Sequence, residues 1–271
     1  MKKHLLLTIF FLVMPIILLA VKFCPHCGYR MQSDRVECPK CLRLIDWPVY
    51  PPRNEKATII VREGKDAFIR HPRSQNRAYR SNRNAGGDLT GQIGSWGFLT
   101  GLRYLVSFNI EKSFADAKID MNHFEFTSAK LRLYVADKKI DQQIPIRVYP
   151  LARPFQEGID RFHIRSKIPT GCTWELSAPM LPWRIPGGDY YKDISCPGIL
   201  GKNGQRECVI DVSAIYKYRF AQFKETGIWN DPGMIIMRDP EKACECTFLS
   251  IYSLENKTKS GIVVSPQLFI E

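Results

Sequence analysis

The sequence predicts an all-β fold, a jelly-roll-type antiparallel β-sandwich with one short helix, preceded by a small four-cysteine module. Apolar and polar residues alternate with a period of two in several short segments. Long stretches rich in Pro, Gly and aromatic residues separate these segments, and a single segment keeps helical spacing. With 271 residues and 45% apolar content, the chain is long enough to bury a core.

The N-terminus predicts export. Lys2 and Lys3 precede an uncharged apolar run at residues 5–21, and Ala20 near its end suits cleavage by signal peptidase. We favour a cleaved signal peptide over residues 1–21. An uncleaved membrane anchor stays open, because the run has a length that can span a bilayer. In both cases the rest of the chain is expected outside the cytoplasm, secreted or at the cell surface.

The formal net charge of +12 favours an anionic partner. Acidic polysaccharide, nucleic acid and anionic membrane all carry the required charge. Since export removes the chain from nucleic acid, we expect an acidic polysaccharide or another component of the cell envelope. Contact with a membrane is expected only through an uncleaved N-terminal segment.

Two Cys-x-x-Cys pairs follow the apolar run, Cys24 with Cys27 and Cys38 with Cys41. Such pairs can place four thiolates around one Zn²⁺ at about 2.3 Å, and residues 22–46 resemble a zinc ribbon. Four protein ligands leave no open position, so the zinc is expected to be structural. The alternative is that these four cysteines form two disulfides, since the chain is expected to be exported. A disulfide between the two cysteines of so tight a turn would be strained, which favours zinc.

Closely spaced prolines predict a linker at residues 47–56, which leaves residues 57–271 as the main domain. Its basic beginning is typical of a solvated face. The segment at 82–101 is rich in Gly and Asn, which favours short strands and tight turns. Further strands are expected at residues 58–61, 102–110, 128–135, 144–149, 233–237, 246–250 and 268–270.

Residues 128–135 show the clearest alternation, with one apolar face and one polar face. The polar row consists of Lys130, Arg132 and Tyr134. Residues 154–204 lack periodicity and are expected to form long loops that cover the sheets or carry function.

The single predicted helix begins after Asp211, whose side chain can cap it, and ends at Gly227. Its apolar positions keep helical spacing at Val212, Ile215, Tyr216, Phe220 and Phe223.

The order of these segments resembles the DNRLRE domain family across residues 57–271. The resemblance rests on residues 102–110 and 128–135, Phe155-Gln-Glu-Gly, Thr173-Trp174, Trp183 with Gly187-Gly188-Asp189-Tyr190, Ile210-Asp-Val-Ser, Ser253-Leu-Glu and Ser265-Pro-Gln-Leu. It implies a non-catalytic β-sandwich of exported proteins, some of whose members bind uronic-acid polysaccharides such as alginate. Phe155 stands where the family usually has Trp, and this departure bears on sugar specificity rather than on fold.

A polymer of uronates presents carboxylates and the apolar faces of sugar rings, so its binding site needs Arg or Lys and flat aromatic side chains. Trp174 is expected in the core instead, and Asp189 is favoured as a turn-stabilising residue over a Ca²⁺ ligand. The ligand-binding candidates are Arg132, Tyr134, Arg147, Trp183, Arg184 and Tyr190.

We expect no enzyme, since the chain has no His-Glu-x-x-His and no Gly-x-Ser-x-Gly. A polysaccharide lyase stays open, as does a glycosidase that would use Glu157 and Glu175. From a different class, the alternative is a structural or adhesive envelope protein that acts through protein contacts. The main domain has five cysteines, Cys172, Cys196, Cys208, Cys244 and Cys246. Because five is an odd number, at least one of them cannot form a disulfide within the domain.

Overall fold

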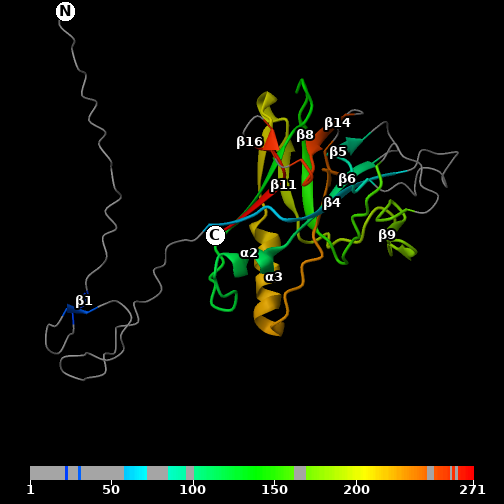
Figure 1. Cartoon of the computed structure of the whole chain (residues 1–271). Helices are drawn as coiled ribbons and strands as arrows, with labels where there is room; N and C mark the ends of the chain where they lie inside the picture. Colours follow the sequence, from blue (N-terminus) through cyan, green and yellow to red (C-terminus); the bar gives the residue numbers. More distant parts are fainter. Residues whose placement is uncertain are drawn as a thin grey trace, which may run out of the picture. The chain divides into compact units, whose positions relative to one another are not determined.

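Figure 1 shows the chain as a computed structural model. The chain divides into two units, Met1–Glu55 and Lys56–Glu271. The structure describes residues 22–23, 30–31, 58–71, 85–95, 101–161, 169–242, 247–256, 258–259 and 262–271.

In the first unit, the structure describes one antiparallel pair of strands, β1 (Lys22–Phe23) and β2 (Arg30–Met31). The predicted signal or anchor segment and the predicted linker lie outside the described residues. The same holds for the predicted zinc ligands Cys24, Cys27, Cys38 and Cys41. Zinc binding therefore stays a prediction.

The larger sheet of the second unit has the strand order β11-β8-β13-β6-β5-β14, and β4 also pairs with β6. All pairings in this seven-stranded sheet are antiparallel. Its strands are β4 (Gly64–Arg70), β5 (Thr90–Ser95), β6 (Gly101–Phe108), β8 (Ile144–Pro150), β11 (Cys196–Leu200), β13 (Met234–Arg238) and β14 (Phe248–Tyr252).

The smaller sheet has four antiparallel strands in the order β12-β7-β17-β3. They are β3 (Ile59–Val61), β7 (Ala129–Tyr134), β12 (Glu207–Asp211) and β17 (Gln267–Ile270). Two short hairpins complete the strands: β9 (Leu176–Ala178) with β10 (Leu181–Pro182), and β15 (Thr258–Lys259) with β16 (Ile262–Val263).

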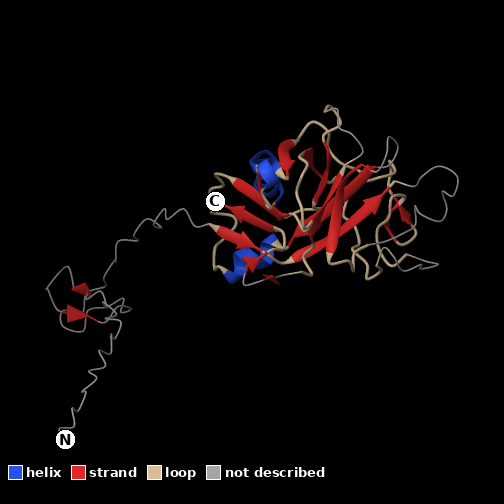
Figure 2. Ribbon diagram, turned by 90° about the horizontal axis from the view of Figure 1, so that it is seen from above, coloured by secondary structure: helices blue, strands red, loops and turns tan. Residues whose placement is uncertain are grey.

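Both sheets turn one apolar face into a shared core. On β7, Ala129, Leu131 and Leu133 are fully buried, and they pack in one cluster with residues of the larger sheet such as Tyr104 and Ile146. Burial of this apolar area is the main favourable contribution to folding. The second unit is dominated by strands (Figure 2), and the predicted all-β class is confirmed.

The seven-stranded sheet also has a second apolar face. Ala67, Ile69 and Leu105 point away from the shared core and form a separate cluster with loop residues, among them Phe155 and Trp174. These loop residues come from segments 151–161 and 169–195, which we call the loop layer. Of the loops predicted at 154–204, the described residues up to 195 therefore cover the outer face of the larger sheet, whereas residues 196–200 form its strand β11.

The predicted helix is α3 (Ser213–Thr226). The Asp211 carboxylate accepts a hydrogen bond from the backbone N–H of Ser213 at 2.9 Å, and Gly227 ends the helix in the left-handed region with φ +71°. Gly227 therefore ends the helix as expected, whereas the prediction that Asp211 caps it was wrong: the capping position is Val212, which makes no side-chain hydrogen bond to the helix, and Asp211 precedes it.

The prediction of a single helix was wrong, because the described residues also form α2 (Ile110–Asp116) and a 3-10 turn, η1 (Lys202–Gly204). The strand predicted at 102–110 ends at Phe108. Asn109 then caps α2 by accepting a hydrogen bond from the N–H of Lys112 at 3.2 Å, and Ile110 and Phe114 bury one face of the helix. In a helix of two turns, this face was too short to stand out in the sequence.

Candidate functional site

The loop layer is built on two tryptophans that lie in its core. Trp174 and Trp183 have exposed fractions of 6% and 4%, and the Trp183 indole donates a hydrogen bond to the Thr173 carbonyl at 2.9 Å. The core position expected for Trp174 is confirmed. Trp183, predicted as a ligand-binding residue, supports the loops from inside and presents no open ring face.

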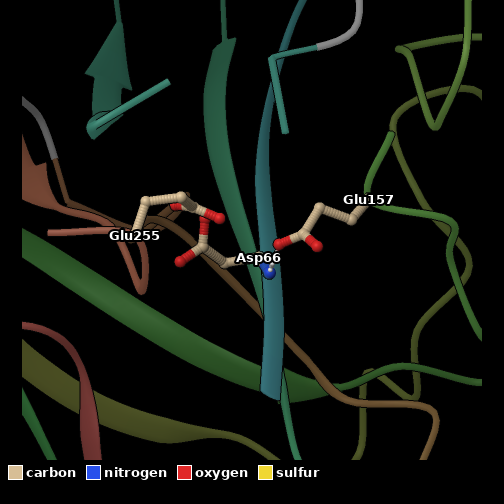
Figure 3. A group of neighbouring side chains, drawn as sticks. All are labelled: Asp66, Glu157 and Glu255. Carbon is tan, nitrogen blue, oxygen red and sulfur yellow. Dashed lines mark hydrogen bonds between the residues drawn. The ribbon is translucent and has the colours of Figure 1, made fainter. Parts of the chain in front are cut away.

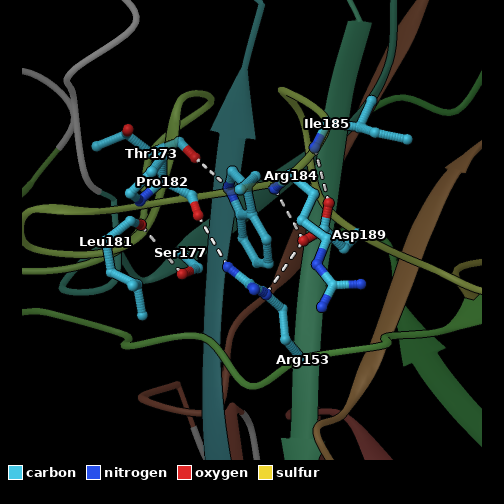
Figure 4. Close-up of polar contacts among 9 residues, drawn as sticks. Arg153, Thr173, Ser177, Leu181, Pro182, Arg184, Ile185 and Asp189 are labelled. Atoms are coloured by element: carbon cyan, nitrogen blue, oxygen red, sulfur yellow. Dashed lines mark hydrogen bonds and ion pairs between the residues drawn. The ribbon is translucent and has the colours of Figure 1, made fainter.

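Asp189 fixes the turn that follows Trp183 (Figure 4). Its carboxylate accepts hydrogen bonds from the backbone N–H groups of Arg184 at 3.0 Å and Ile185 at 2.8 Å, and it pairs with Arg153 at 3.1 Å. Arg153 also donates to the Pro182 carbonyl at 2.9 Å. With these partners, the carboxylate stabilises the turn, as favoured from the sequence, and Arg184 is left exposed beside it.

This turn contacts Arg103, whose side chain lies on the outer face of β6. The Arg103 guanidinium donates to the Gly187 carbonyl at 2.6 Å and lies over the Trp174 ring at 4.6 Å and near the Tyr190 ring at 6.0 Å. A Cβ at Gly187 would come within 2.7 Å of the guanidinium and 2.6 Å of the Trp174 ring. The cradle therefore requires glycine at this position.

Arg103 has aromatic neighbours but no acidic one. None of the described residues places a carboxylate within ion-pair distance of its guanidinium. Burial lowers the pKa of Arg103, and only the neighbouring Tyr190 and Tyr149 act in the opposite direction. Arginine remains charged in proteins, so this side of the loop layer carries a partly buried positive charge that no carboxylate of the described chain balances.

Tyr190, Tyr149 and Arg147 continue from Arg103 on the same face of the sheet. The Tyr149 and Tyr190 rings are 4.8 Å apart, and Tyr149 and Arg147 occupy alternate positions of β8. Since β13 separates β6 from β8, the two arginine-bearing strands are about 10 Å apart. We call Arg103, Tyr190, Tyr149 and Arg147 the Arg103 strip.

Arg147 differs from Arg103 in having acidic partners. Its guanidinium pairs with Asp239 at 3.2 Å and Glu241 at 2.9 Å, and it donates to the Ser195 hydroxyl at 3.1 Å. The contact with the Asp239 carboxylate is the main cause of the raised pKa of Arg147. Arg103 is thus the more available cation of the strip.

Arg132 and Tyr134 belong to the other sheet. They line the outer face of β7, where the Arg132 guanidinium pairs with Glu207 at 2.9 Å and lies 4.6 Å above the Phe269 ring. The Tyr134 hydroxyl donates to Glu207 at 3.3 Å. The six predicted ligand residues are therefore divided between two sheets, and the structure brings only Arg147, Trp183, Arg184 and Tyr190 to the loop-layer side.

An acidic cluster lies at the edge of β4 (Figure 3). Ligand oxygens of Asp66, Glu157 and Glu255 lie within 4.8 Å of one another. Asp66 is 1% exposed and accepts hydrogen bonds from the Tyr104 hydroxyl at 2.6 Å and the N–H of Leu254. The N–H of Asp66 in turn donates to the Glu157 carboxylate at 2.6 Å.

Burial, reinforced by Glu255, raises the pKa of Asp66 well above its ordinary value. Burial also raises the pKa of Glu157 to about 7, and Glu255 adds to this increase. Part of the cluster is therefore protonated at neutral pH. Carboxylate oxygens suit Ca²⁺, but Ca²⁺ takes 6–8 oxygen ligands, of which these three side chains supply a part. The hydrogen bonds instead fasten the loop layer to β4 and to the turn after β14.

The acidic cluster was missed from the sequence. The sequence suggests Glu175 as the acidic partner of Glu157 in a glycosidase, whereas the structure groups Glu157 with Asp66 and Glu255. Asp66 did carry a signal, because it is a single acid directly before the apolar residues 67–69 of a strand. Arg103 carried a similar one, as a single cation on a strand of apolar residues.

The cysteines of the second unit are buried where they are described. Burial raises the pKa of Cys172 to about 12 and the pKa values of Cys196 and Cys208 to about 11, so these thiols are protonated and unreactive at neutral pH. Cys196 and Cys208 take part in no disulfide. Cys244 and Cys246 lie outside the described residues.

No protein-family model matches this chain, and no curated protein matches it significantly. Within the described residues, no helix combines the length and apolar character needed to cross a bilayer.

Proposed function

We propose that this chain is an exported, non-catalytic protein that binds an acidic, uronate-type polysaccharide along the Arg103 strip. In this proposal the second unit is a jelly-roll-type β-sandwich of DNRLRE character, and the first contains a zinc ribbon with a purely structural metal. The resemblance to the DNRLRE family supports the proposed sandwich, and the predicted signal or anchor segment supports the location outside the cytoplasm. The strip supplies the residue types that a uronate chain needs.

The observation that carries the proposal is the state of Arg103. A partly buried guanidinium without a carboxylate partner has lost hydration that no opposite charge of the described chain replaces. An incoming carboxylate would restore that balance through charge-assisted hydrogen bonds, which are among the strong ones in proteins. Trp174 and Gly187 hold the guanidinium in one orientation, which reduces the entropy lost on binding.

The neighbouring rings suit the same ligand. Tyr190 is half-buried and stands between Arg103 and Tyr149, so a sugar ring could pack on it while its carboxylate reaches Arg103. The net charge of +12 would bring an anionic polymer toward the protein, and this part of the attraction is screened by salt.

Affinity electrophoresis against alginate, pectate and a neutral glucan tests the proposal. We expect the full-length protein to be retarded by one uronate polymer and not by the neutral one. Arg103→Gln should weaken retention about tenfold, the effect of losing a hydrogen bond to a charged group. Arg103→Lys keeps the charge and the donor to Gly187 but loses the planar fork, so its loss should be intermediate.

Arg132→Gln on the other sheet is the matched control and should bind like the wild type. Loss of binding in Arg132→Gln but not in Arg103→Gln would move the ligand to the smaller sheet and overturn the assignment to the strip. Absence of retention on every anionic polymer at low salt would overturn the function itself. An absorbance assay for unsaturated products is expected to stay flat on all uronates.

Exposed apolar side chains of the loop layer favour a second candidate function, an envelope protein that acts through protein contacts. Met180 and Ile185 have exposed fractions of 92% and 60%. Exposed apolar residues mark contact surfaces when they gather in one patch. A stoichiometric protein partner recovered from the envelope fraction, together with no binding to any glycan, would favour this candidate.

A further inference from the structure

A groove of about 790 Å³ opens at a different place from the Arg103 strip. Four segments form it: the turn between β3 and β4, the start of α2, residues 229–231 after α3, and residues 254–255 after β14. Its volume falls in the range of about 300–1,000 Å³ that small-ligand sites occupy. No residue of the strip lines it.

The apolar part of the groove is rigid. Phe108 and Ile110, both buried, contribute to its lining, and Trp229 is half-buried beside them. The Trp229 ring packs against Phe220 at 4.9 Å and against Phe223 at 6.0 Å between ring centroids. An indole held in this way offers a fixed apolar surface at little cost in side-chain entropy.

The charges that line the groove cancel. Its carboxylates are Glu63, Glu111, Asp231 and Glu255, and its cations are Arg62 and Lys65. Lys112 pairs with Glu63 at 2.8 Å and Arg219 pairs with Asp231 at 3.1 Å, which neutralises two of the carboxylates. Lys65 and Glu255 turn toward the acidic cluster and the loop layer: the Lys65 ammonium donates to the Phe155 carbonyl at 2.6 Å, and a Glu255 oxygen lies within 4.8 Å of oxygens of Asp66 and Glu157. Glu111 and Arg62 remain, one charge of each sign, so the groove has no net charge to select a polyanion or a polycation.

We propose that this groove binds a neutral oligosaccharide. The apolar face of a sugar ring fits against Trp229, and its hydroxyl groups have carboxylates and the exposed amide of Asn230 as partners at the rim. A purely apolar ligand would bury these charged groups without hydrogen bonds, which is unfavourable. This site is independent of the proposed uronate site, and it would let one chain hold two different polysaccharides.

Isothermal titration of the full-length protein with cello-, xylo- and mannohexaose, each a neutral probe, tests the inference. We expect one of them to bind at a single site. Trp229→Phe should weaken that binding several-fold. Glu111→Gln and Asn230→Ala each remove a hydrogen bond to a sugar hydroxyl and should weaken the binding about tenfold. Glu111 and Asn230 are exposed, so these two variants are expected to fold normally even if Trp229→Phe does not.

Arg103→Gln is the cross-control and should bind the neutral hexaose like the wild type. Conversely, Glu111→Gln should keep its retention on uronate polymers, so failure of one site is distinguishable from failure of the other. The inference is overturned if none of the three hexaoses binds at millimolar concentration, or if all three groove variants bind as the wild type does. Competition of oligolysine for the groove would overturn it as well.

Discussion

At the scale of single residues, the same side chain has different roles according to its partners. Arg132 pairs with a carboxylate of the neighbouring strand β12 and Arg147 with carboxylates of the turn after β13, while Arg103 contacts a carbonyl and two aromatic rings. Ion pairs on the surface contribute little to stability, but they occupy the donors that a ligand would use. Among these three arginines, Arg103 is therefore the one with no carboxylate occupying its donors.

Glu157 makes stability depend on pH. Its pKa rises from the ordinary 4.5 to about 7 in the folded chain, mainly through burial. The folded state therefore holds a proton that the unfolded state releases between these values, and stability falls as pH rises from about 5 to about 8. Above that range the contribution of Glu157 is lost. Thermal unfolding followed at several pH values should show a falling melting temperature.

Glu157→Gln should flatten this dependence, because the amide stays neutral at every pH. Asp66 still titrates in the variant, so a smaller slope is expected to remain. Glu225→Gln on the exposed side of α3 serves as the control and should keep the wild-type slope. An unchanged slope in Glu157→Gln would show that this carboxyl titrates alike in both states.

Among the helices and strands, some are specified by local sequence signals and others by tertiary contacts. The C-terminal end of α3 follows from Gly227, and Asp211 bonds to the first helical residue from one position before the cap; both are local. α2 has seven residues, too few to be stable alone, and it exists because Ile110 and Phe114 pack into the shared core. The strands of the larger sheet similarly depend on partners far away in the chain, such as β6 with β4 and β13.

Gly227→Ala isolates one of these local signals. Gly227 has φ +71°, and a Cβ there would meet nothing within 4 Å, so only the left-handed backbone opposes the substitution. We expect a loss of about 1 kcal/mol in the free energy of unfolding, measured by urea denaturation. Glu225→Ala should change it by less than about 0.5 kcal/mol. Equal effects in both variants would exclude the backbone explanation.

At the scale of the whole molecule, the second unit contains two apolar clusters that share the larger sheet. One cluster lies between the two sheets, and the other lies between the larger sheet and the loop layer. The Arg103 strip belongs to the layered side, and the groove lies where the ends of several elements meet. The described residues of both clusters all belong to Lys56–Glu271, so we expect this unit to fold independently of the four-cysteine segment.

Metal removal tests that independence. We expect the full chain to carry one Zn²⁺, and Cys38→Ser to lose it, while Cys196→Ser keeps it. Chelation should leave the main thermal transition in place, because the described core of the second unit contains no residue of the first. Elemental analysis combined with calorimetry measures both effects. Four cross-linked cysteines and no metal would contradict the zinc prediction.

The all-β class, the clearest strand and the main helix could be predicted from the amino-acid sequence alone. Alternation along residues 128–135 and helical spacing after Asp211 are local patterns, and they follow directly from which face of an element is buried. The helix α2 could not be predicted in this way, because only two of its residues, Ile110 and Phe114, form its apolar face.

The candidate sites, in contrast, depend on how distant parts of the chain come together in space. Alternation shows that Arg103, Arg132 and Arg147 point outward, but not which carboxylates lie beside them, because those come from distant strands and loops. Asp66, Glu157 and Glu255 are likewise far apart in the chain and meet at one sheet edge. Charge balance depends on distance in space, and pairing of distant segments sets that distance.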